Sequence, residues 1–177
     1  MPDDELRRLL GEIQRRGAIG PVDLVDAIHH ADDFVRALPE GPLSVIDLGS
    51  GGGLPGLVIA VRRSDATLLL VERRAKRADL LRYAVRALGV DDHVVVTETD
   101  ASRLGPTLRG PADVVTARSF GAPSVMMPIA APLLRPGGLL VVSEPPDRQS
   151  RWDSSELLTW GFEELDLVGG VRRLVRR

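Results

Sequence analysis

The chain has no cysteine among its 177 residues, only 3% aromatic residues and a single lysine, Lys76. The missing cysteine excludes disulfides, thiolate metal ligands and a cysteine nucleophile. No apolar run approaches the roughly 18 residues that a membrane-spanning helix needs. The opening stretch, MPDDELRRLL, is charged from its third position onward, unlike a secretory signal. We therefore expect a cytoplasmic protein without membrane contacts.

The residues that are present indicate a globular protein. A hydrophobic content of 44% suits an aliphatic core, and the length suits one domain over residues 1–177. The formal net charge of −2 predicts no general affinity for nucleic acid. The 22 arginines leave two interpretations open: a bias in genomic base composition, or recognition of phosphate by guanidinium groups.

Helical patterns occupy the first 40 residues. Apolar residues recur at helical spacing over 3–16 and again over 21–38, and Pro39 ends the second pattern. We expect residues 1–40 to form a helical lead-in to an α/β core over 43–177.

Short aliphatic runs alternate with helical stretches from residue 43 onward. Runs that are apolar on both faces are typical of a parallel sheet covered by helices on both sides. The tail predicts a short helix over 153–160 and then two strands joined at Gly169-Gly170, a hairpin signal. The predicted fold class is α/β: a doubly wound, mostly parallel seven-stranded sheet with N-terminal helices and a C-terminal β-hairpin. The other expected strands are 43–48, 67–72, 93–98, 112–117 and 138–143, and the helices between them are 55–63, 74–88 and 122–134.

A glycine-rich turn follows the first strand, in the stretch LSVIDLGSGGGLPG at 43–56. Ligands of doubly wound sheets bind beyond the carboxyl ends of the strands. Gly51, Gly53 and Gly56 match the G-x-G-x-x-G pattern of dinucleotide binders, and Glu72 stands where the ribose-binding acid is expected. A nicotinamide or flavin enzyme is therefore one candidate, and a tight turn without a ligand is another.

Three acids at the ends of successive strands favour a different ligand. Asp47, just before the turn, would repel a pyrophosphate, whereas S-adenosylmethionine presents a sulfonium cation, an ammonium group and a ribose diol. Glu72 would accept from the ribose hydroxyls and Asp100 from the adenine edge. The alternative for Glu72 and Asp100 is that each is a solvated loop acid.

The motifs resemble the class I methyltransferases, and more narrowly the bacterial family that makes 7-methylguanosine in 16S ribosomal RNA, also called glucose-inhibited division protein B. The similar stretches are VIDLGSGGGLPGL at 45–57, LLLVERRAKRADLLR at 68–82 and DVVTARSF at 113–120. The resemblance implies S-adenosylmethionine as cofactor and ribosomal RNA or the small ribosomal subunit as partner. It also implies a Rossmann-like fold and Arg118 at the junction of cofactor and substrate. The expected cofactor-binding residues are Asp47, Gly49, Ser50, Gly51, Gly53, Leu54, Glu72, Asp100, Ala101, Ser102 and Arg118.

One departure from the family leaves the substrate open. Ser143-Glu144 stands where the family usually has Lys-Gly after the fifth strand, which removes a cation and adds an acid. A small-molecule methyltransferase is therefore an alternative, and a nicotinamide-dependent oxidoreductase or a non-catalytic cofactor-binding protein are less favoured ones.

The sequence predicts neither a catalytic acid or base nor a metal site. Methyl transfer to guanine N7 needs no general base, because the ring nitrogen has a free lone pair and the sulfonium is already activated. Catalysis would then depend on positioning and electrostatics. His29, His30, Asp32 and Asp33 have a spacing that could hold a metal, but we interpret them as a polar helix face.

Overall fold

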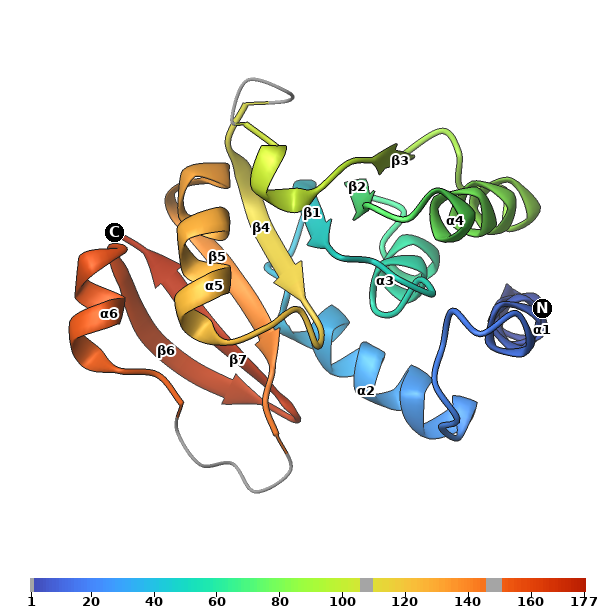
Figure 1. The fold of residues 1–177 in the computed structure, drawn as a ribbon, viewed down its shortest axis with the longest axis horizontal. Coiled ribbons are helices and arrows are strands. Elements are labelled where there is room, and N and C mark those ends of the chain that lie inside the picture. The colour runs from blue at the N-terminus through green and yellow to red at the C-terminus, as the bar shows by residue number, and fades with distance from the viewer. Residues whose placement is uncertain (1, 106–109, 146–150) are drawn as a thin grey trace.

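The computed structural model describes residues 2–105, 110–145 and 151–177 (Figure 1). The expected strands and helices are present, and most of their ends shift by a few residues. Parts of the predicted 43–177 core, at 106–109 and 146–150, lie outside the described residues. The elements, with η for 3-10 helices, are α1 (Pro2–Arg15), α2 (Leu24–Ala37), β1 (Leu43–Leu48), α3 (Gly56–Arg62), β2 (Ala66–Glu72), α4 (Ala75–Ala87), β3 (Val94–Glu98), η1 (Ala101–Arg103), β4 (Ala112–Ala117), α5 (Pro123–Ala130), η3 (Ala131–Leu133), β5 (Leu134–Ser143), α6 (Ser154–Thr159), β6 (Phe162–Val168) and β7 (Val171–Arg176).

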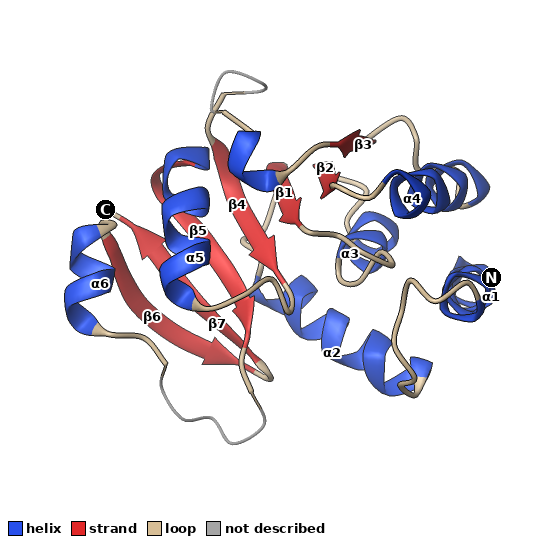
Figure 2. Cartoon of the chain, in the orientation of Figure 1, coloured by secondary structure: helices blue, strands red, loops and turns tan. Residues whose placement is uncertain are grey.

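The strands form one sheet in the order β3-β2-β1-β4-β5-β7-β6 (Figure 2). Neighbours among β1 to β5 pair in parallel, and β7 pairs antiparallel with both β5 and β6. The predicted fold class is thus confirmed. The chain winds outward from β1 in one direction to β3 and then restarts beside β1 at β4, so β1 and β4 flank the point where the strand order reverses. Ligands bind at such a point in open α/β sheets.

Two hydrophobic layers cover the sheet, one on each face. Helices α1 to α4 pack on the face that presents Val45, Leu68 and Val114. Helices α5 and α6 pack on the other face, against Ile46 and Val115. Successive strand residues point to opposite faces, so an apolar run that is buried on both sides needs a helical layer on each.

The N-terminal helices are part of the first layer. Leu6, Leu10 and Ile13 of α1 are buried in it, as their helical spacing predicts. Asp23 caps α2, because its side chain accepts from the backbone N–H groups of Val25 and Asp26. The loop between the two helices lies against the glycine-rich turn, where Ala18 and Ile19 approach Gly52.

The fifth strand differs most from expectation. It begins at Leu134 instead of 138, because Leu134 pairs with Ala112 before the register shifts. The helix expected over 122–134 ends at Ala130 and continues as the short 3-10 segment that contains Pro132. Proline has no N–H to donate and its ring crowds the preceding turn, which disfavours a longer α-helix.

In the described part of the chain, no helix is long and apolar enough to cross a membrane. Among the same residues, no group of three or more His, Cys, Asp or Glu side chains is arranged to hold a metal ion. His30 packs edge-on against Phe34, and Asp33 accepts from the backbone N–H of Gly170 at 2.8 Å. This part of the HHADD stretch thus joins α2 to the β6–β7 turn.

Candidate functional site

Asp47 lies buried beneath the glycine-rich turn, with 1% of its surface exposed. Its Oδ1 accepts a hydrogen bond from the Thr116 hydroxyl at 2.7 Å, whereas its Oδ2 makes none within the described residues. Burial raises the pKa of Asp47 to about 6, against the opposing effects of Thr116 and of the Arg118 charge. A Cβ on Gly56 would lie 2.7 Å from Oδ2, so only glycine allows this approach.

Glu72 holds the turn from the neighbouring strand. Its Oε2 accepts from the backbone N–H of Gly51 at 3.0 Å, and its Oε1 accepts from that of Arg74 at 2.8 Å. The carboxylate therefore ties the turn after β1 to the start of α4. Each oxygen keeps a second lone pair for another donor.

Asp100 follows β3 at the same edge of the sheet. Its Oδ1 accepts from the backbone N–H of Ser102 at 3.0 Å and from the Ser102 hydroxyl at 2.7 Å. These hydrogen bonds lower the pKa of Asp100, and it stays a carboxylate at neutral pH. The side chain is partly exposed, with Arg73 at 3.9 Å.

Glu72 and Asp100 line one cavity of about 410 Å³, named here the Glu72 cavity. The structure thus brings together five of the predicted site residues: Gly49, Glu72, Asp100, Ala101 and Ser102. Asp47 is not among the residues that line this cavity or the two described next. The other lining residues are Val71, Arg73, Arg74, Arg77, Thr99, Ser119, Phe120, Val125 and Ile129.

A smaller cavity of about 310 Å³, the Arg77 cavity, lies on the other side of the turn. Ala18 and Ile19 close it from the loop between α1 and α2. Gly53 lines none of the three cavities, and a Cβ at this position would collide with Leu57 and come close to Leu81. The predicted residues that line the Arg77 cavity are Gly49, Ser50, Gly51, Leu54 and Arg118.

The largest of the three, about 580 Å³, is named the Glu144 cavity and lies beyond β4 and β5. Arg118 lines it together with His30. Burial lowers the pKa of Arg118, and the charge of Asp47 opposes this effect. Burial and the Arg118 charge also lower the pKa of His30, which favours the neutral imidazole at pH 7.

The segment after β4 lines more than one cavity. Ser119 lines all three, and Phe120 lines the Glu72 and Glu144 cavities. Ser119 is the non-glycine residue with a positive φ (54°) among the described residues, a conformation that costs free energy and is enriched at functional sites. The Phe120 ring lies against Gly49, where a Cβ would come within 2.8 Å of its Cδ2.

The family model for rRNA small subunit methyltransferase G matches residues 13–155 of the chain. The chain belongs to this family. Over 177 aligned residues it is 35% identical to ribosomal RNA small subunit methyltransferase G of Leifsonia xyli subsp. xyli, a match that covers 96% of this chain and 83% of the relative. It is 32% identical to the protein of that name from Leptothrix cholodnii, covering 86% of this chain and 70% of the relative.

Solved structures show the same fold for this methyltransferase G family member. A crystal structure of coclaurine N-methyltransferase, bound to N-methylheliamine and SAH, superposes with a TM-score of 0.62 at 17% identity, covering 79% of this chain and 48% of the other. The chain is therefore an S-adenosylmethionine-dependent methyltransferase. Family membership removes the nicotinamide-dependent oxidoreductase as an alternative.

The residues at the Glu72 cavity of this methyltransferase G family member fit that cofactor. Two carboxylates, Glu72 and Asp100, offer acceptors for hydroxyl and amino groups, and Gly49 presents bare backbone to the cavity. Sequence reasoning missed Phe120 and Arg77 as site residues, although both lie in motifs that carry the family resemblance. The available signal was their place three residues after β4, for Phe120, and five residues after β2, for Arg77.

Proposed function

We propose that the chain transfers a methyl group to a guanine ring nitrogen of ribosomal RNA in the small subunit. One observation supports this most: the Glu72 and Glu144 cavities meet at Ser119 and Phe120. A methyl donor in the first cavity and an acceptor base in the second would be neighbours, as direct displacement requires.

The Glu72 cavity is the proposed donor site. When bound there, S-adenosylmethionine supplies a methyl group that is already activated by its sulfonium charge. Glu72 has lone pairs left for the ribose hydroxyls, and Asp100 for the adenine amino group. Asp47 is buried beneath the turn, so we assign it a role in fixing the turn and in the local negative potential.

The Glu144 cavity is the proposed acceptor site. Guanine N7 carries a free lone pair, so this chain's residues need only orient the base and exclude water. Arg118 lines both this cavity and the Arg77 cavity, where its guanidinium can meet a phosphate or a base edge. Neutral His30 adds a polar wall without a second positive charge.

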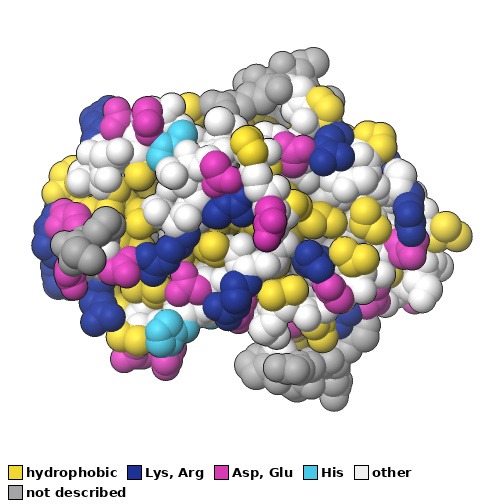
Figure 3. Space-filling model, turned by 180° about the vertical axis from the view of Figure 1, so that it is seen from behind, with side chains coloured by type: hydrophobic (Ala, Val, Ile, Leu, Met, Phe, Trp, Pro, Cys, Tyr) yellow, Lys and Arg dark blue, Asp and Glu magenta, His cyan; other side chains and the backbone are white. Residues whose placement is uncertain are grey.

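The acid at position 144 does not weaken the case for RNA. Glu144 is paired inside the protein with Arg172, whose Nε lies 2.9 Å from Oε1, and its side chain is 3% exposed. It therefore presents little negative charge at the cavity mouth. Arg77 and Arg118 meanwhile line the Arg77 cavity, where a phosphate group would find two cations. On the face seen in Figure 3, by contrast, basic and acidic side chains of the described residues are interspersed.

The test is methyl transfer from tritiated S-adenosylmethionine to small ribosomal subunits that lack the modification. We expect label in the RNA, released by chain cleavage specific for 7-methylguanosine, and none with fully modified subunits. Calorimetry with S-adenosylhomocysteine runs in parallel. Cofactor binding without any label in the RNA would contradict the ribosomal substrate and favour a small-molecule acceptor.

A further inference from the structure

Two buried polar atoms at the Glu144 cavity, Glu144 Oε2 and Arg151 Nε, form a long ion pair without a hydrogen bond. Glu144 Oε2 and Arg151 Nε have no hydrogen-bond partner among the described residues, and 3.6 Å separates them. Both residues line the cavity. Buried polar atoms that lack a hydrogen bond are rare in folded proteins because each costs free energy, so an ion pair of two such atoms at a cavity indicates groups that a ligand could bond.

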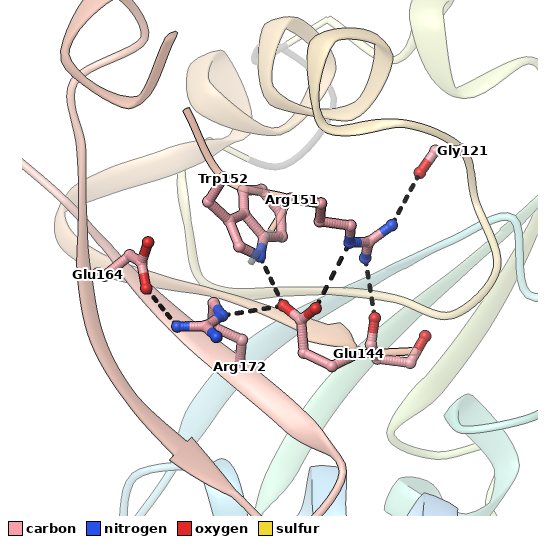
Figure 4. A network of polar contacts seen from close by, with 7 residues as sticks. Gly121, Glu144, Arg151, Trp152, Glu164 and Arg172 are labelled. Atoms are coloured by element: carbon pink, nitrogen blue, oxygen red, sulfur yellow. Dashed lines mark hydrogen bonds and ion pairs between the residues drawn. The ribbon is translucent and has the colours of Figure 1, made fainter. Parts of the chain in front are cut away.

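The rest of the network holds this pair in place (Figure 4). Glu144 Oε1 accepts from Trp152 Nε1 at 2.5 Å and from Arg172 Nε at 2.9 Å. Arg172 also pairs with Glu164 on β6. The Arg151 guanidinium donates to the backbone oxygen of Ser143 at 2.8 Å. These bonds fix the two side chains, and Glu144 Oε2 and Arg151 Nε share an ion pair but no hydrogen bond.

Glu144 Oε2, an acceptor, and Arg151 Nε, a donor, match the donor and acceptor of one base edge. Guanine carries an N1–H donor next to its O6 acceptor, whereas adenine carries an N1 acceptor next to an amino donor. A carboxylate oxygen accepts from N1–H, and an arginine Nε–H donates to O6. Adenine would place its N1 lone pair against the carboxylate. Engagement of the N1–O6 edge leaves guanine N7 free.

We propose that Glu144 and Arg151 read the N1–H and O6 groups of the acceptor guanine and so determine its specificity. This inference rests on the proposed function for the identity of the acceptor. The Arg151 side chain is 32% exposed, and its shift, at the expense of its hydrogen bond to Ser143, would let the base edge reach Glu144.

The test compares the binding of three nucleoside monophosphates to the complex of the protein with S-adenosylhomocysteine, followed by ligand-detected NMR. We expect guanosine and inosine monophosphates to bind on the order of tenfold to a hundredfold more tightly than adenosine monophosphate, because inosine keeps N1–H and O6. Equal binding of all three would overturn the proposal. So would inosine monophosphate binding as weakly as the adenosine compound.

Variants separate base reading from structural support. Glu144→Gln and Arg151→Gln should each lose the preference for guanosine over adenosine monophosphate, with S-adenosylhomocysteine affinity unchanged. Glu164→Gln is the matched control, since it removes the other carboxylate partner of Arg172 but lines no described cavity. An equal loss of preference in Glu164→Gln would show that the network only supports the structure of the cavity, and would overturn the proposal. A wild type that shows this preference but labels no RNA would contradict the proposed function alone.

Discussion

Thr116 donates a 2.7 Å hydrogen bond to Oδ1 of Asp47, so a hydroxyl on β4 holds a carboxylate on β1 beneath the glycine-rich turn. The two residues are direct partners in the sheet register. The bond satisfies one oxygen of the buried acid and leaves the other facing Gly56. Burial therefore dominates the acid's titration.

The first prediction concerns stability and pH. The folded pKa of Asp47 is about 6, against an ordinary value of 3.8. A raised folded pKa means that the stabilising contribution is fully present below pH 3.8 and is lost as pH rises through about 6. For this group alone, the unfolding free energy should fall by about 3 kcal/mol over that window. In Asp47→Asn this fall should vanish, as measured by urea unfolding across the window.

The exposed Asp91 provides the control for that experiment, because Asp91→Asn should keep the wild-type pH profile. A constant difference between wild type and Asp47→Asn at every pH would contradict the assigned titration. Calorimetry on the same variant shows whether Asp47 also contributes to cofactor affinity, as the sequence predicts.

The second prediction concerns Glu72. Glu72→Gln should weaken S-adenosylhomocysteine binding by about 1–3 kcal/mol, because a charge-assisted acceptor is lost and the Gly51 N–H loses its anion. Glu98→Gln is a matched control, since Glu98 pairs with Glu72 in register and lines no described cavity. Calorimetry at pH 7 measures both variants. If the two substitutions weaken binding equally, Glu72 has no special role.

The third prediction separates backbone strain from collision at Gly49. Gly49 has φ +67°, and an added Cβ would meet the Phe120 ring. Gly49→Ala should reduce the unfolding free energy by more than the roughly 1–3 kcal/mol of left-handed strain alone. Gly41→Ala controls for strain, since Gly41 has φ +82° and nothing near its Cβ position. Equal losses in the two variants would show that Phe120 yields without cost.

The fourth prediction concerns Arg118, which lines the Glu144 and Arg77 cavities but not the Glu72 cavity. Arg118→Gln should lower kcat/KM for methyl transfer by about tenfold to a hundredfold, as expected for a lost charged hydrogen bond. S-adenosylhomocysteine affinity should change much less. Arg86→Gln, on the exposed end of α4, makes the same change in net charge and should leave both quantities near wild type. A loss of S-adenosylhomocysteine affinity as large as the loss of kcat/KM would show that Arg118 contributes mainly to cofactor binding.

Local patterns in the sequence were enough for the order and type of the elements and for one edge of the site. Period and composition reveal a doubly wound sheet because strands buried on both faces are apolar throughout. The carboxyl ends of parallel strands meet at one edge, so Gly49, Glu72 and Asp100 could be placed together in advance. The division of 1–177 into one helical lead-in and one core remains a prediction.

Only the tertiary structure decided what each acid does. Asp47 and Glu72 stand at similar strand ends in the sequence, yet the fold buries the first against Thr116 and turns the second toward a cavity. The sequence shows Glu144 only as an added acid after the fifth strand, whereas the fold places Arg172 of β7 beside it. Burial and ion pairing set the charge that each side chain can offer to a ligand. Both depend on segments that lie far apart in the chain, which local sequence patterns do not reveal.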